Sequence, residues 1–88
     1  MDVAITPAAE RIARVLAGQR ISANAGGEED SAADLIELAW KDHFADAVAV
    51  LHTLRAPDRA MAAVGDPMIW ERMILAAIEE AKPRTVIL

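Results

Sequence analysis

The chain has 88 residues, of which 55% are hydrophobic, 26% are charged and 3% are aromatic, and its formal net charge is -5 at pH 7. This length leaves room for one domain only and little room for a large catalytic cleft. The absence of cysteine excludes disulfides, thiolate zinc sites and cysteine nucleophiles.

Alanine occupies 20 of the 88 positions. It is the best helix former but buries little surface, so the composition favours helices around a thin core. The larger apolar residues still give each expected helix an apolar stripe, which argues against intrinsic disorder. A domain this small without disulfides relies on packing or on association. We therefore expect self-association.

The first helix is predicted over residues 7–17. Thr6 is placed to cap it, the fixed φ of Pro7 suits its first position, and Gly18 is expected to end it. Its apolar positions recur at helical spacing: Ala8, Ile12, Val15 and Leu16. Residues 19–30 show no sustained period and are predicted to form a loop.

The second helix is predicted to run unbroken from a cap at Ser31 to Leu54, before Pro57. Glu37 and Lys41 are expected to form an i,i+4 ion pair on its polar side. At about 100° per residue, one broad face collects the large apolar side chains: Ile36, Trp40, Phe44, Ala47, Leu51 and Leu54.

Two further helices follow. A short one is predicted over residues 57–64, with Gly65 as a left-handed stop. Asp66 then caps a fourth helix that begins at Pro67 and ends near Lys82. Its expected core face holds Trp70, Met73, Ile74, Ala77, Ile78 and Ala81. Residues 83–88 form a short, apolar, β-prone tail.

The predicted fold is thus an all-α single domain over residues 1–88, with three main helices and one short helix, and we expect the bundle to be dimeric. Loop 19–30 and tail 83–88 complete the chain. The expected core consists of Trp40, Phe44, Leu51, Trp70, Ile74 and Ile78, closed by Ile12 and Leu16.

Motifs for chemistry are weak. His43 and Asp46 are the one acid-base pair worth considering, and the simpler interpretation is a histidine at the core edge bonded to Asp46. No glutamate has a histidine three residues later, as a carboxylate-bridged di-iron bundle requires. Nucleophile, phosphate-loop and calcium-loop patterns are also missing. We predict no catalytic residue, no metal ligand and no cofactor.

The short helix, Gly65 and the fourth helix have the outline of a helix-turn-helix. The negative charge of the chain and the apolar start of the fourth helix argue against contact with phosphates. We therefore expect no nucleic-acid partner. No stretch approaches the roughly 20 uncharged residues that span a bilayer, and the first residues lack a secretory pattern, so we expect a cytoplasmic protein without a membrane partner.

Several apolar side chains fall outside the expected core faces, and a helix that is apolar on more than one side is usually covered on more than one side. A second copy about a two-fold axis is the simplest cover. The candidate contacts are Leu35, Leu38, Met68, Leu75, Val86, Ile87 and Leu88.

These patterns favour a small non-catalytic protein-interaction or regulatory module, expected to be a homodimer that also contacts another protein. The alternative is a protein that binds or senses a small ligand in a pocket near Trp40, His43 and Trp70. A DNA-associated regulator and a minor enzyme are weaker alternatives.

Overall fold

The computed structural model describes residues 3–25 and 32–82, and within these ranges every regular element is helical. The all-α prediction is therefore confirmed. In chain order the elements are α1 (Ala8–Ala25), α2 (Ala32–Ala39), the 3-10 helix η1 (Trp40–His43), α3 (Phe44–Leu54), α4 (Arg59–Ala62) and α5 (Pro67–Ala81).

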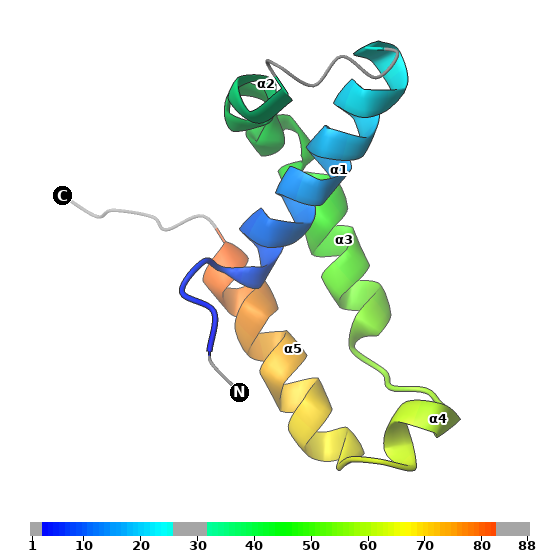
Figure 1. Cartoon of the computed structure of the whole chain (residues 1–88). Coiled ribbons are helices and arrows are strands. Elements are labelled where there is room, and N and C mark those ends of the chain that lie inside the picture. The colour runs from blue at the N-terminus through cyan, green and yellow to red at the C-terminus, as the bar shows by residue number, and fades with distance from the viewer. Residues whose placement is uncertain (1–2, 26–31, 83–88) are drawn as a thin grey trace, which may run out of the picture.

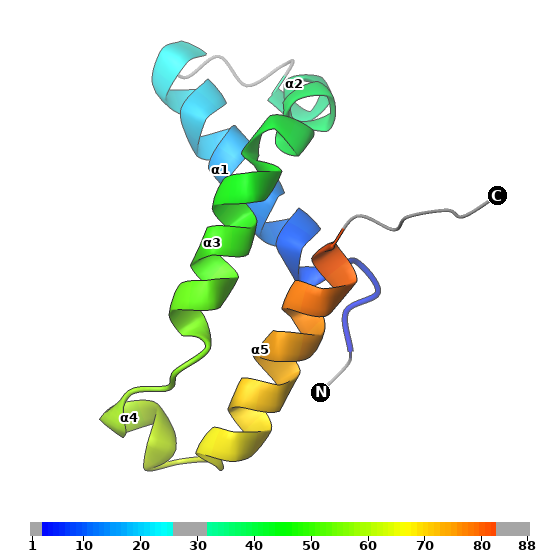
Figure 2. The ribbon, with the colours of Figure 1, turned by 180° about the vertical axis from the view of Figure 1, so that it is seen from behind.

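Helices α3 and α5 form an antiparallel pair with α4 at its tip (Figure 1). Helix α1 crosses one face of this pair, near the start of α3 and the end of α5, and α2 lies beside the second half of α1. Seen from behind, α3 and α5 lie in front of α1 (Figure 2). The molecule therefore has α1 on one face of the α3–α5 layer, and no described element on the other.

Helix α1 continues through Gly18 to Ala25, so the predicted stop at Gly18 is wrong, and so is the predicted loop 19–30 over residues 19–25. A glycine inside a helix costs only about 1 kcal/mol relative to alanine. Here α2 packs directly on that glycine: a Cβ at Gly18 would lie 3.3 Å from Cδ1 of Ile36. Tertiary contact therefore overrides the local stop signal.

The predicted second helix is not continuous. Ala39, the residue before η1 (φ -104°, ψ -17°), and His43, the last residue of η1 (φ -101°, ψ 7°), have φ values far from the α-helical value of about -63°. No glycine or proline occurs between Ala32 and Leu54 that would cause the break. Both halves pack on α1, one as α2 and the other as α3. Because the chain bends at η1, both α2 and α3 stay in contact with α1. A single straight helix would contact α1 over a shorter length. The predicted cap at Ser31 lies outside the described residues.

The two caps at the tip are local and simple. Asp58 accepts a hydrogen bond from the backbone N–H of Met61 (3.0 Å) at the start of α4. The predicted cap at Asp66 and the predicted start at Pro67 are both confirmed in α5. The short helix is shorter than predicted, and φ of Gly65 lies outside the left-handed region, so that part of the prediction is wrong.

The core of the described residues is thin. Four of the seven buried hydrophobic residues are alanines, and the larger ones belong to α3 and α5. Because an alanine side chain removes little apolar surface from water, this burial stabilises the fold weakly for its length. The buried residues are Ala9, Ala13, Ala17, Ala47, Leu51, Ile74 and Ile78.

The predicted core is right at its centre and wrong at its edges. Phe44, Trp70 and Ile12 pack against the buried cluster of Ala9, Leu51, Ile74 and Ile78. Trp40 and Leu16 are half-buried and lie outside that cluster. On α1 the buried stripe is alanine, and Val15, predicted to lie on the packed face, is 60% exposed.

Candidate functional site

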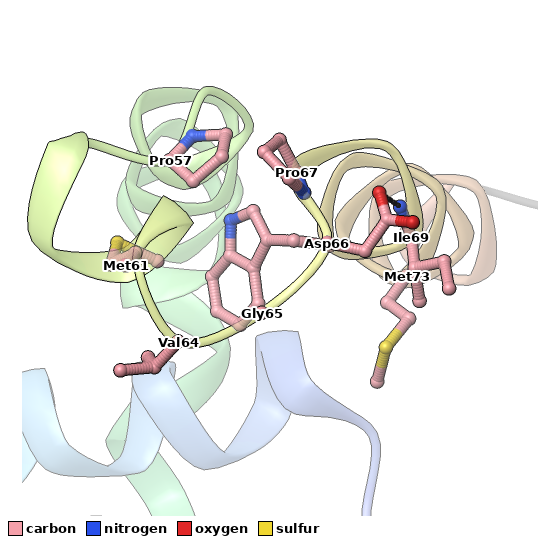
Figure 3. Close-up of a pocket in the computed structure, with 9 residues that line it drawn as sticks. Pro57, Met61, Val64, Gly65, Asp66, Pro67, Ile69 and Met73 are labelled. Carbon is pink, nitrogen blue, oxygen red and sulfur yellow. Dashed lines mark hydrogen bonds between the residues drawn. The ribbon is translucent and has the colours of Figure 1, made fainter.

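An open apolar cavity of about 340 Å³ lies at the tip of the molecule, between α4 and the start of α5. Met61 and Val64 lie on one side of it, and Ile69 and Met73 lie on the other (Figure 3). Pro57 and Trp70 complete the apolar lining. We call this space the tip cavity.

The local sequence fixes the shape of the tip cavity. Asp66 accepts hydrogen bonds from the N–H groups of Met68 (2.9 Å) and Ile69 (3.4 Å), which sets the direction in which α5 begins. The indole N–H of Trp70 donates to the carbonyl oxygen of Leu54 at 2.7 Å. This bond ties α5 to the last residue of α3 and holds the indole between the two chain segments.

The tip is apolar, and none of the described elements covers it. Four large side chains are strongly exposed there: Val64 (88%), Met68 (75%), Met73 (62%) and Ile69 (53%). Among the residues that line the cavity, Asp66 alone carries a charge, and it is engaged as the helix cap. We call Met61, Val64, Met68, Ile69, Trp70 and Met73 the tip surface.

The structure does not bring the predicted interface residues into one patch. Leu35 (41% exposed) and Leu38 (80%) lie on α2, at the end of the molecule opposite the start of α5 (Figure 1). Met68 belongs to the tip surface, and Leu75 (41% exposed) lies about two turns further along α5. Val86, Ile87 and Leu88 lie outside the described residues.

The predicted pocket residues Trp40, His43 and Trp70 are also separated. Trp40 and His43 belong to η1, before the start of α3, whereas Trp70 bonds to the last residue of α3. An 11-residue helix separates them, which is a distance of about 16 Å. The cavity that the structure does contain at Trp70 includes neither Trp40 nor His43.

Trp40 instead belongs to a polar cluster between α1 and η1. The guanidinium carbon of Arg14 lies 5.1 Å from the centre of the Trp40 ring, within the range of a cation–π interaction. Arg14 also bonds to Glu10 (2.9 Å) and to Glu37 (2.8 Å). The hydrogen bond from Arg14 lowers the pKa of Glu37.

The polar cluster corrects one prediction. Glu37 pairs with Arg14 and not with Lys41, because α1 brings the guanidinium of Arg14 within 2.8 Å of the Glu37 carboxylate on α2. The ammonium group of Lys41 also lies over Trp40, 5.8 Å from the centre of its ring.

The described residues contain little else that could carry chemistry. The expected hydrogen bond between His43 and Asp46 does not occur among them. Nor do these residues bring three histidine or carboxylate side chains together as a metal would require. Over the same part of the chain, no helix combines the length and the apolar character needed to cross a membrane.

Most of the tip surface does not follow from helical periodicity. The predicted place of Met73 on the core face of the fourth helix is wrong, because its side chain is 62% exposed. Met61 lies in a helix too short to show a period, and Val64 lies in the turn that follows it, so periodicity gives neither residue a role. A usable signal is present in the sequence: six large apolar side chains within residues 61–73, separated by few charges.

Comparison with known proteins gives no relative: no family model, no curated protein and no solved structure matches the chain significantly.

Proposed function

We propose that this chain is a small non-catalytic interaction module that forms a homodimer through its tip surface. The observation that carries the proposal is the group of four large apolar side chains at the tip, 53% to 88% exposed, three of which line an apolar cavity. Monomeric proteins rarely leave a contiguous apolar patch of this kind uncovered.

The shape of the tip suits a second copy. In a two-fold interface each contact occurs twice: if residue i of one copy contacts residue j of the other, then residue j of the first copy contacts residue i of the second. A protrusion beside a hollow can therefore fit the same protrusion and hollow on a second copy. Met68, which is 75% exposed, lies on α5 between Pro67 and Ile69, two residues that line the tip cavity. In the proposed dimer the Met68 side chain of each copy enters the tip cavity of the other.

The electrostatics of the tip favour the same occupant. Burying a charge is costly unless it is paired, and the charge that lines the tip cavity is already engaged, because Asp66 accepts two N–H groups at the start of α5. The thin alanine core adds a reason for association, since a small domain gains from a partner what its own core does not supply.

Light scattering coupled to size-exclusion chromatography at micromolar concentration tests the dimer. We expect a particle of twice the chain mass of 9.4 kDa. Met68→Asp and Met73→Asp should each give a particle of single mass with unchanged helicity by circular dichroism, because both side chains are exposed in the monomer. A wild-type protein of single mass would overturn the proposal.

Leu38→Asp is the matched control. It places the same charge on a side chain that is 80% exposed at the other end of the molecule. We expect this variant to remain dimeric. Dissociation by Leu38→Asp with retention of the dimer in Met68→Asp would move the interface from the tip to α2.

The tip cavity also favours a second candidate function, the binding of a small apolar ligand. Its volume of about 340 Å³ falls within the range of roughly 300–1,000 Å³ that small-molecule sites occupy. The probe is toluene, added to the monomeric Met68→Asp variant. A saturable rise in melting temperature that Met73→Asp abolishes would support a ligand site, whereas no rise would leave the dimer as the role of the tip.

A further inference from the structure

A second apolar groove lies on the face of the α3–α5 layer that α1 does not cover. It has a volume of about 320 Å³ and is separate from the tip cavity. We call it the open-face groove, and its lining consists of Phe44, Ala45, Val48 and His52 on α3, with Ile78, Ala81 and Lys82 at the end of α5.

Helix geometry places this groove away from the packed side of α3. Successive residues are about 100° apart, so Ala45 and His52 project roughly 140° to 160° away from Ala47. Ala47 is fully buried, whereas Ala45 and His52 are exposed. The floor of the groove, formed by Val48 and Ile78, is the side of the core that lacks a covering helix.

We propose that residues 83–88 of the same molecule occupy the open-face groove. The chain enters this segment at Lys82, which itself lines the groove. Lys82 has extended backbone angles (φ -68°, ψ 140°), so the chain leaves the helix there, as a residue before proline favours. The segment that follows contains three consecutive apolar residues, Val86, Ile87 and Leu88.

The lengths agree. Helices α3 and α5 are antiparallel, so the end of α5 lies near the start of α3. A segment that lies in the groove would therefore run from the start of α3 toward His52. The rise along α3 from Ala45 to His52 is about 11 Å. Four extended residues, 85–88, span about 13 Å, which leaves Pro83 and Arg84 to make the turn.

The side chains also suit the groove. In an extended segment alternate side chains point to opposite sides, so Val86 and Leu88 would face the apolar floor together. Burial of these two side chains would cover part of the core that α1 leaves open. The proposal is independent of the dimer, because the open-face groove and the tip cavity share no lining residue.

Disulfide trapping tests the proposal in the full chain, which has no cysteine of its own. The test variant carries His52→Cys and Leu88→Cys. The control carries Thr53→Cys and Leu88→Cys, because Thr53 is adjacent in sequence and exposed but lies about 100° further round α3, outside the groove. Both are equilibrated in a glutathione redox buffer, and the products are separated on non-reducing gels.

We expect the disulfide of the test variant to form within one chain, with an effective concentration at least about tenfold above that of the control. Equal effective concentrations in the two variants would overturn the proposal. A product of double chain mass from the His52→Cys variant would also overturn it, since the segment would then occupy the groove of a second copy.

A pair of tail variants supplies an independent readout. Val86→Asp should lower the melting temperature by about 4 to 8 °C if it removes about 1 kcal/mol of burial, with helicity retained. Thr85→Asp places the same charge one residue earlier, on the opposite side of the extended segment, and should leave the melting temperature unchanged. Equal melting temperatures for Val86→Asp and the wild type would contradict the proposal.

Discussion

Arg14 is the residue through which α1 holds α2 and η1 by charge. Its guanidinium bonds to Glu10 on its own helix and to Glu37 on α2, and it stacks on Trp40. The two carboxylates raise the pKa of Arg14, with the hydrogen bond to Glu37 as the largest cause. Arg14 and Glu37 are 23 residues apart in sequence, so their ion pair is a tertiary contact.

This pair gives the protein a pH dependence that Glu37→Gln should remove. The pKa of Glu37 is lower in the folded chain than its ordinary value, so the folded state binds fewer protons than the unfolded state as the pH falls. The stabilisation is therefore complete above the ordinary glutamate pKa of about 4.3 and is lost as the pH falls through the lower folded value. Urea unfolding midpoints of wild type and variant should differ near neutral pH and converge in acid.

Glu80→Gln is the control for that titration. Glu80 is exposed on α5, and the structure gives it no ion pair among the described residues. Its substitution should leave the pH dependence of the midpoint as in the wild type. Parallel curves for Glu37→Gln and wild type would show that the Arg14 pair contributes nothing to stability in solution.

At the residue scale, contacts between neighbours along the chain were predictable from the sequence, and contacts between residues far apart in the chain were not. The Asp66 cap was predictable because the N–H groups that it accepts belong to the next residues of the chain. The partner of Glu37 was not, because Lys41 is the neighbour along the helix and Arg14 becomes a neighbour only after folding. The same limit applies to Trp40, whose neighbours on α1 are set by the fold.

At the element scale, Gly18 tests how closely α1 and α2 are fitted. Gly18→Ala gains about 1 kcal/mol of helix propensity in the middle of α1. The added Cβ meets Cδ1 of Ile36 at 3.3 Å. That atom is the far end of a flexible side chain, so a small rotation relieves the contact. We expect a net stabilisation of about 0.5 kcal/mol by equilibrium urea unfolding.

A larger side chain at the same site should have the opposite effect. Gly18→Leu must displace Ile36 or the helix that carries it, and we expect destabilisation of about 1 to 3 kcal/mol. Gln19→Leu is the matched control, because Gln19 is the next residue and is exposed. If Gly18→Leu were as stable as Gln19→Leu, α2 would not pack on α1 as described.

The elements themselves were predictable only where their boundaries are coded locally. The start of α5 follows from Asp66 and Pro67, and the structure has it there. The end of α1 and the break at η1 were not predictable, because a glycine continues a helix when another helix covers it, and a helix bends without glycine or proline when both halves pack on a third. The packed face of α1 was predicted from its large apolar side chains, whereas the residues that α1 buries are alanines.

At the scale of the whole molecule, two of the apolar surfaces lie beside a thin core. The tip surface lies at the turn between α4 and α5, and the open-face groove lies between α3 and the end of α5. One is suited to a second copy and the other to the chain that follows Lys82. In the two proposals a second copy covers the tip surface and residues 83–88 cover the open-face groove. The free energy of folding of the monomer and the free energy of dimerisation can then be measured separately.

Protein concentration separates these contributions. A dimer that unfolds to two chains gains about 1.4 kcal/mol in the free energy of unfolding for each tenfold rise in concentration, because unfolding then releases more particles than it consumes. We expect the urea midpoint of the wild type to rise with concentration and that of Met68→Asp to stay constant. Val86→Asp, which affects the groove, should lower the midpoint by the same amount at every concentration. A wild-type midpoint that is independent of concentration would mean that the chain unfolds as a monomer and that the tip surface is not covered by a second copy.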